Sequence, residues 1–198
     1  MPRINTEYRE EAKRKIITAA LEVATSDGWQ RVTLETIARK VGVTKGAFYS
    51  YFPSSTVLMQ DVVIGMIRTI RDQLLDELSE GADKELEIDR VGDFLFSRIK
   101  PIFPAFVQAM ASEIPREPEF RQRLSGLLDE NHEKIVAVLS RYQENGQIPE
   151  EVNLSSAVLS IYGMSIGLGM MTHVLGKDSA VIKQVWTDTV RKILSLPA

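Results

Sequence analysis

The residues with the clearest chemical pattern lie in the segment TLETIARKVGVTKGAFYSYF, which runs from Thr33 to Phe52. Residues four positions apart share a face of a helix, so Phe48 and Phe52 lie on one face, and Lys45 and Tyr49 lie on the neighbouring one. The two Phe side chains are expected to pack inward, which turns Lys45 and Tyr49 outward. An ammonium group and a phenol on an exposed helix suit contact with the phosphates of DNA.

Small and hydroxyl-bearing residues in the same segment support this interpretation. Thr33 and Thr44 stand where two short helices are expected to begin, and helix N-termini bind phosphates readily. Gly42 can adopt the positive φ of a tight turn between the two helices. Gly46 costs about 1 kcal/mol in a helix relative to Ala, but its missing side chain lets a sugar-phosphate backbone approach closely. The segment therefore predicts a helix-turn-helix with an outward face on DNA.

The rest of the chain must position this segment, and it reads as all-α, because apolar residues recur at helical spacing and strand alternation is absent. We expect a three-helix DNA-binding domain in residues 1–53 and a helical ligand-binding and dimerisation domain in residues 54–198, with about nine helices in all. The expected helices cover about 7–26, 34–41, 45–51, 56–78, 88–112 (kinked or split at Pro101 and Pro104), one that ends near 144, and then 154–175 and 179–196.

Composition and charge narrow the class of protein. The 198 residues include no Cys, which excludes disulfides and Cys-ligated metals. The N-terminus has no apolar core segment typical of a secretory signal, and the apolar stretches are interrupted before the roughly 18 residues of a membrane span, so we expect a cytoplasmic protein with no membrane partner. Residues 1–53 carry nine Lys and Arg against six Asp and Glu, whereas the remainder carries 15 against 21. A basic N-terminal part suits an anionic partner.

Enzymatic and metal chemistry find little support. Asp129, His132 and Glu133 share one helical face and could hold a metal, but a solvated charged face is the simpler interpretation. The sequence contains no HExxH, GxSxG, GxGxxG or P-loop motif. We therefore expect neither an enzyme nor a bound cofactor or metal.

The segment AKRKIITAALEVATSDGWQRVTLETIARKVGVTKGAFYSYF resembles the DNA-binding domain of the TetR family of transcriptional regulators. The similarity includes the spacing from Gly28 to Thr33, the pair Ile37 and Ala38, and GVTKGAFYSYF from Gly42. It covers roughly the first third of the chain, and GQIPEEVN near Gly146 is weakly similar to the turn before the family's penultimate helix.

The resemblance implies roles for individual residues. Base edges would be read near Ala47 and Lys45. One departure is Ser55, which stands where the family usually carries a Lys that contacts phosphate, so weaker DNA binding is expected. Positions at which the family contacts DNA, mostly through phosphates, are Thr33, Thr44, Lys45, Gly46, Tyr49 and Tyr51.

A two-fold dimer is expected of such a DNA reader. The resemblance implies a four-helix dimer interface formed by the last two helices of each subunit. Small residues in LSSAVLSIYGMSIGLGMMTHVL suit close helix contact, although a helix of the intramolecular core is the alternative. The candidate interface residues are Gly163, Gly167, Val181, Val185 and Ile193.

A ligand pocket in the body is also expected, mainly from the resemblance. Met and aromatic side chains are adaptable lining for apolar pockets, but each of them could equally be ordinary core. The candidate pocket residues are Met59, Val63, Met66, Ile67, Ile70, Phe94, Phe103, Phe106, Met110, Tyr162 and Met170.

These observations predict a homodimeric transcriptional regulator, a repressor, that binds a palindromic operator and is released by a small hydrophobic ligand acting through the helix after Pro53. Two alternatives remain open. One is a DNA-binding dimer without a small-molecule effector, and the other is a helical small-molecule-binding module with weakened DNA binding.

Overall fold

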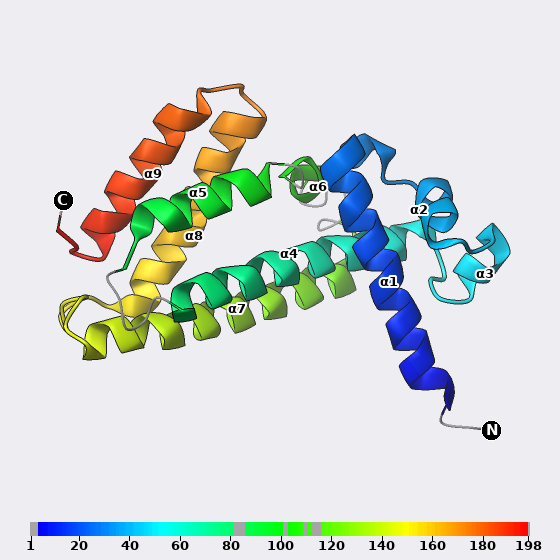
Figure 1. Cartoon of the computed structure of the whole chain (residues 1–198), viewed down its shortest axis with the longest axis horizontal. Coiled ribbons are helices and arrows are strands. Elements are labelled where there is room, and N and C mark those ends of the chain that lie inside the picture. The colour runs from blue at the N-terminus through cyan, green and yellow to red at the C-terminus, as the bar shows by residue number, and fades with distance from the viewer. Residues whose placement is uncertain (1–3, 81–85, 101–102, 109–110, 112–115, 198) are drawn as a thin grey trace.

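The computed structural model describes residues 4–80, 86–100, 103–108, 111 and 116–197, and within these residues the chain forms helices and turns without a strand. This confirms the all-α prediction. Figure 1 shows the arrangement. In chain order the elements are α1 (Ile4–Asp27), a 3-10 turn η1 (Trp29–Arg31), α2 (Leu34–Val41), α3 (Lys45–Tyr49), α4 (Ser55–Glu80), α5 (Ile88–Ile99), α6 (Phe103–Gln108), α7 (Pro118–Glu144), α8 (Leu154–His173) and α9 (Ser179–Ile193).

The N-terminal helices share one apolar core. On α1 the buried residues include Ile16, Ala20 and Val23, and α2 contributes Ile37 and Ala38 to the same core. Phe48 and Phe52 close it from the other side. The first half of α4 completes the core, because Leu58 and other apolar residues beyond position 53 are buried in it. The core members from α1 and α4 are Ile16, Ala19, Ala20, Val23, Ala24, Leu58, Val62 and Met66.

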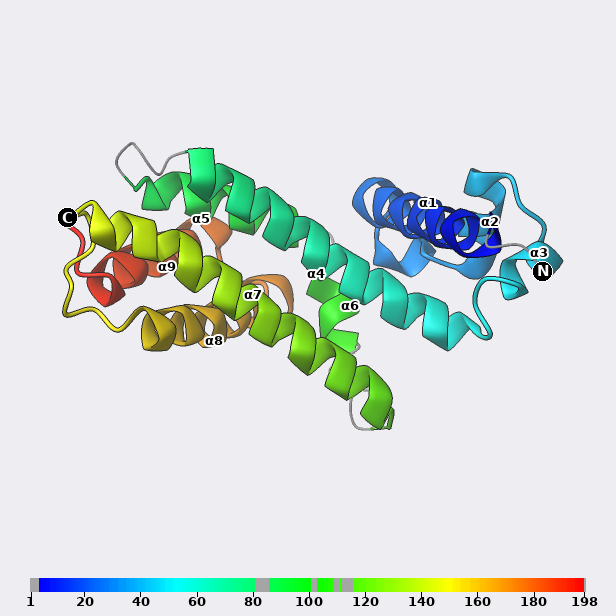
Figure 2. The ribbon, with the colours of Figure 1, turned by 90° about the horizontal axis from the view of Figure 1, so that it is seen from below.

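The long helix α4 joins the two parts of the molecule. Its N-terminal half packs against α1, and α7 lies beside much of its length in both views (Figures 1 and 2). Asp61 on α4 forms an ion pair with Arg123 on α7. One continuous helix therefore connects the N-terminal domain to the body.

The remaining helices cover the other side of the body. α5 packs against α9 and α4, and α8 packs against α7 and α9. Trp186 and Tyr142 are among the fully buried side chains of this larger core. The Tyr142 hydroxyl donates a hydrogen bond of 2.6 Å to the backbone oxygen of Leu78, which fastens α7 to the end of α4.

The expected helix over 88–112 is divided in the structure. α5 ends at Ile99, and a separate short helix, α6, begins at Phe103. The cause is the pair Pro101 and Pro104, since a proline inside a helix removes a backbone donor and clashes with the preceding turn. Pro101 itself lies outside the described residues.

Candidate nucleic-acid interface and internal cavity

Both helices of the predicted helix-turn-helix begin at a threonine cap. The Thr33 side chain accepts a hydrogen bond of 3.1 Å from the backbone N–H of Thr36. The Thr44 side chain accepts one of 3.1 Å from the backbone N–H of Ala47. Gly42, which ends α2, has a φ of 72°, the left-handed conformation that glycine adopts without steric cost. The local signals in the sequence therefore correspond to real caps and a real tight turn.

The inward face of α3 is fixed by aromatic packing. Phe48 and Phe52 are fully buried, and their ring centroids lie 5.4 Å apart. Arg9 on α1 adds a polar link, because its Nη2 donates a hydrogen bond of 2.9 Å to the backbone oxygen of Ser50. Sequence reasoning missed Arg9, which lies 41 positions away in the chain with no local signal to mark it.

The outward face of this region carries most of the predicted contact residues. Gly46, Ala47 and Tyr49 are exposed, with Tyr49 exposed over 47% of its surface. Tyr51 differs, because it is half-buried and packs against the N-terminal core. The side chain of Lys45 lies outside the described part of the structure.

Ser55, the departure from the family pattern, is the exposed first residue of α4. The preceding Ser54 caps the helix, and its Oγ accepts a hydrogen bond of 3.2 Å from the backbone N–H of Val57. The N-terminus of a long helix carries a partial positive charge, so this position remains favourable for a phosphate without a lysine.

A cavity of about 850 Å³ lies inside the body, between α4, α5, α6, α7, α8 and α9. Pockets for drug-sized ligands span about 300–1,000 Å³, so a molecule of this class fits. Seven of the candidate pocket residues line the cavity, namely Val63, Met66, Ile67, Ile70, Phe103, Phe106 and Tyr162.

Other candidate pocket residues lie elsewhere. Met59 packs against the N-terminal core, and Phe94 packs against the larger core of the body. Met170 is exposed on α8. None of these three lines the cavity, because helical spacing identifies an apolar stripe but not which neighbour the stripe faces. Met110 lies outside the described residues.

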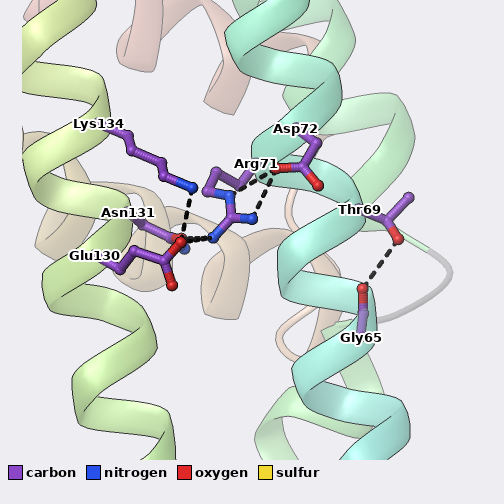
Figure 3. A network of polar contacts seen from close by, with 7 residues as sticks. All are labelled: Gly65, Thr69, Arg71, Asp72, Glu130, Asn131 and Lys134. Carbon is purple, nitrogen blue, oxygen red and sulfur yellow. Dashed lines mark hydrogen bonds and ion pairs between the residues drawn. The ribbon is translucent and has the colours of Figure 1, made fainter. Parts of the chain in front are cut away.

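Sequence reasoning missed a buried charge in the cavity wall. Arg71 on α4 is 8% exposed, and its guanidinium contacts two carboxylates and one amide (Figure 3). It donates to Oδ1 of Asp72 at 2.8 Å, to Oε1 of Glu130 at 3.0 Å and to Oδ1 of Asn131 at 3.1 Å. Lys134 lies 2.7 Å from the same Glu130 oxygen. These five residues are the Arg71 network, and it links α4 to α7 beside the cavity.

Of the side chains considered as metal ligands, His132 contacts α8 instead. Nε2 of His132 lies 3.0 Å from the backbone oxygen of Ser155 on α8. Over the residues that the structure describes, no group of three or more His, Asp or Glu side chains is arranged to hold a metal ion.

The outer face of α8 and α9 is apolar and exposed. Val181 and Val185, two candidate interface residues, are exposed over 60% and 45% of their surfaces, whereas Ile193 is half-buried and packs on the body core. Gly163 and Gly167 are exposed, and a Cβ built on either would meet no atom within 4 Å. We call this surface the α8–α9 face; its other exposed apolar members are Leu159, Met170, Met171, Val174 and Leu175. Two of its members, Leu159 and Gly163, also border the cavity.

Gly169, on the same helix, has a packing role within the subunit. A Cβ at Gly169 would collide with the Phe103 ring, so the glycine lets α6 approach α8 within the subunit. By length and composition alone α8 could also cross a membrane. Polar residues interrupt the apolar stretch of α8, and the expectation that no segment spans a membrane stays a prediction.

Comparison with known proteins agrees with this geometry. Residues 16–62 match the family model for bacterial regulatory proteins of the tetR family. The chain is 26% identical over 212 residues to the HTH-type transcriptional regulator TtgR of Pseudomonas putida, covering 99% of this chain and 97% of that protein.

One further protein matches part of the sequence, and another has a similar fold. A 70-residue stretch is 34% identical to the nucleoid occlusion factor SlmA of Actinobacillus pleuropneumoniae, covering 35% of this chain and 34% of that protein. A TetR transcription regulator from Haloarcula marismortui has a similar fold, with a TM-score of 0.71 and 17% identity over 94% of this chain and 97% of that one.

Proposed function

We propose that this chain, a DNA-binding transcriptional regulator of the TetR family, is a cytoplasmic homodimeric repressor. The dimer binds a palindromic operator and releases it when a small hydrophobic effector enters the cavity. One observation carries this proposal. Met66 on α4 belongs to the buried core of the N-terminal domain and also lines the cavity. A ligand that displaces Met66 therefore acts directly on the packing that holds the DNA-binding helices.

The proposed coupling runs along α4. Val63, Ile67 and Ile70 on this helix border the cavity, while Leu58 and Val62 support the DNA-binding domain from the same helix. Interiors are close-packed, so a shift of one packed helix forces its neighbours to move. Moving α4 alters the position of α3 relative to its copy in the dimer. The coupling free energy for such systems is typically about 1–3 kcal/mol.

The proposed dimer uses the α8–α9 face. Contiguous exposed apolar surface of this kind usually marks an interaction site, and outward glycines allow a second helix to approach closely. A two-fold axis through this face presents two copies of α3 to one side of a duplex. Successive major grooves on that side are about 34–36 Å apart.

The proposed DNA contacts use the exposed side of α3 and the two capped helix starts. Tyr49 and the backbone at Gly46 would meet phosphates, Ala47 would face a base edge, and the N-termini at Thr33 and Thr44 would bind phosphate oxygens. Lys45 and Tyr51 complete the proposed contact set.

A titration of labelled DNA from the region upstream of the protein's own gene tests the proposal. Fluorescence anisotropy gives the affinity of the dimer with and without compounds selected by a thermal-shift screen of hydrophobic molecules. We expect at least one stabilising compound to weaken DNA binding by about 5- to 150-fold.

A filled-cavity variant separates the effector role from DNA binding itself. Ile135 on α7 lines the cavity, so Ile135→Phe reduces the space available to a ligand. We expect this variant to bind DNA but to respond less to the compound, while Ala137→Phe, on the exposed side of the same helix, responds normally. A DNA-binding dimer that no stabilising compound releases would instead match the effector-free alternative.

A further inference from the structure

We propose that the cavity selects a neutral, largely apolar molecule whose carbonyl oxygen accepts a hydrogen bond from the hydroxyl of Tyr162. This inference rests on the proposed effector function and specifies the chemical class of the effector. It follows from one unpartnered hydroxyl, from the engagement of its polar neighbours and from the charge balance of the Arg71 network.

Tyr162 lies on α8 and lines the cavity. Its hydroxyl is buried and has no hydrogen-bond partner among the described residues. Burial raises the pKa of Tyr162 to about 12, and the positive charge of Arg71 acts in the opposite direction. The phenol is therefore protonated at neutral pH and can donate. A buried donor without an acceptor is costly, so a ligand that supplies an acceptor gains affinity there.

Two other polar side chains of the wall, Ser165 and His132, already have partners. Ser165 accepts a hydrogen bond of 2.8 Å from Nε1 of Trp186, and its own hydroxyl donates to the backbone oxygen of Ile161 at 2.7 Å. His132 lies 3.0 Å from the backbone oxygen of Ser155. These groups have less to gain from a ligand than Tyr162 does.

The charges beside the cavity disfavour an anionic ligand. Arg71 is flanked by the carboxylates of Asp72 and Glu130. A hydrogen bond from Lys134 lowers the pKa of Glu130, and the charge of Arg71 acts in the same direction, so Glu130 is ionised at neutral pH. The two cations and two carboxylates of the Arg71 network balance. Beyond the network, the charge of the exposed Arg68 also acts on Glu130, and the acid Asp129 lies in the wall. A ligand carboxylate would find no uncompensated cation to offset its desolvation.

The remainder of the wall requires an apolar body for the ligand. Val63, Ile67, Ile70, Leu139 and Val158 line it together with other aliphatic side chains. A second polar group on the ligand would lose hydration against these residues without recovering a hydrogen bond. One carbonyl on a hydrophobic skeleton is therefore the best match.

Three matched fluorescent probes test this inference. The first is prodan, a dimethylaminonaphthalene that carries a propionyl ketone. The second is the same dimethylaminonaphthalene without the propionyl group, and the third is the corresponding naphthoic acid. Affinities are measured by fluorescence titration of the full-length protein and of Tyr162→Phe. In the wild type we expect the ketone to bind most tightly and the acid most weakly.

In Tyr162→Phe the ketone should lose about five- to tenfold in affinity, the value of one net hydrogen bond. The ketone-free probe should bind both proteins equally. Equal losses for all three probes, no loss for the ketone, tightest binding by the acid, or no binding of any probe would each overturn the inference.

Tyr142→Phe provides a matched control, because Tyr142 is also buried but its hydroxyl already donates to the backbone oxygen of Leu78. Tyr142 does not line the cavity, so this variant should lower the melting temperature and leave prodan affinity unchanged. Tyr162→Phe should keep the melting temperature, since it removes a hydroxyl with no partner.

The outcome for DNA is read separately. Prodan that binds through Tyr162 but does not release the operator supports the inference and counts against the effector role. A compound that releases DNA but binds the wild type and Tyr162→Phe with equal affinity supports the effector role and overturns the inference.

Discussion

A Cβ atom placed on Gly65 would lie 2.5 Å from Cγ2 of Ile17, so α4 crosses α1 at a point with no room for a side chain. This contact joins the helix that lines the cavity to the helix that supports the DNA-binding helices. It is one of the places where a shift of α4 meets immediate resistance from the N-terminal domain.

Gly65→Ala should therefore destabilise the protein, despite a gain of about 1 kcal/mol in helix propensity. The new methyl group must push α1 and α4 apart, and overpacking of this kind costs about 1–3 kcal/mol. Thermal and urea unfolding measure the net effect, and operator affinity should fall together with stability.

Gly126→Ala is the matched control, because Gly126 lies on α7 with nothing within 4 Å of a built Cβ. That variant should be stabilised. Combining Gly65→Ala with Ile17→Ala, which removes the clashing methyl, should cost less than the sum of the two single changes. Additive costs would show that the crossing is not overpacked.

The helix-turn-helix could be predicted from the sequence because its determinants are local. The caps at Thr33 and Thr44 and the turn at Gly42 each depend on residues within a few positions, and so does the pairing of Phe48 with Phe52. Tertiary packing does not override such signals where several agree.

The cavity wall was less predictable because it depends on contacts between distant segments. Arg71 meets Glu130 and Asn131 across 59 and 60 positions of the chain, and nothing near Arg71 marks it as buried. Met59 lies on the same face of α4 as Met66, two turns towards the N-terminus, but there it packs against the N-terminal core and not against the body. An apolar stripe predicts which face of a helix is buried, but the tertiary arrangement determines which element or cavity that face contacts.

Tyr49 should contribute to DNA binding without contributing to the fold. Its side chain is exposed, so Tyr49→Ala should change the free energy of unfolding by less than about 0.5 kcal/mol. Because a phosphate contact carries no sequence information, affinity should fall for specific and unrelated duplexes alike.

Changes at Ala47, such as Ala47→Ser, should instead alter which sequence is preferred. Anisotropy titrations on a set of operator variants distinguish these patterns, and equal effects of both changes on every duplex would contradict the division of roles.

Ser55→Lys should strengthen DNA binding and steepen its salt dependence. Ser55 is exposed at the start of α4, and each added phosphate contact changes the slope of log affinity against log salt by about 0.9. A lysine at a helix N-terminus opposes the helix dipole by about 0.3–1 kcal/mol, so a slight loss of stability is expected. Gln122→Lys, at an exposed site on α7, makes the same charge change and should leave the slope unaltered. Identical slopes for the two lysine variants would place Ser55 away from the duplex.

The proposed self-association through the α8–α9 face should be lost when a charge is placed on it. Val185 is exposed on α9, so Val185→Glu should not disturb the folded subunit. In a two-fold interface each subunit would bury the new carboxylate against the other, at a cost that weakens the dimer by more than about tenfold. Sedimentation equilibrium measures the dimer affinity, and operator affinity should fall with it because two copies of α3 must act together. Ala137→Glu, on the exposed side of α7, introduces the same charge outside this face and should preserve the dimer. Val185→Glu that remained fully dimeric and bound its operator normally would move the interface to another part of the surface.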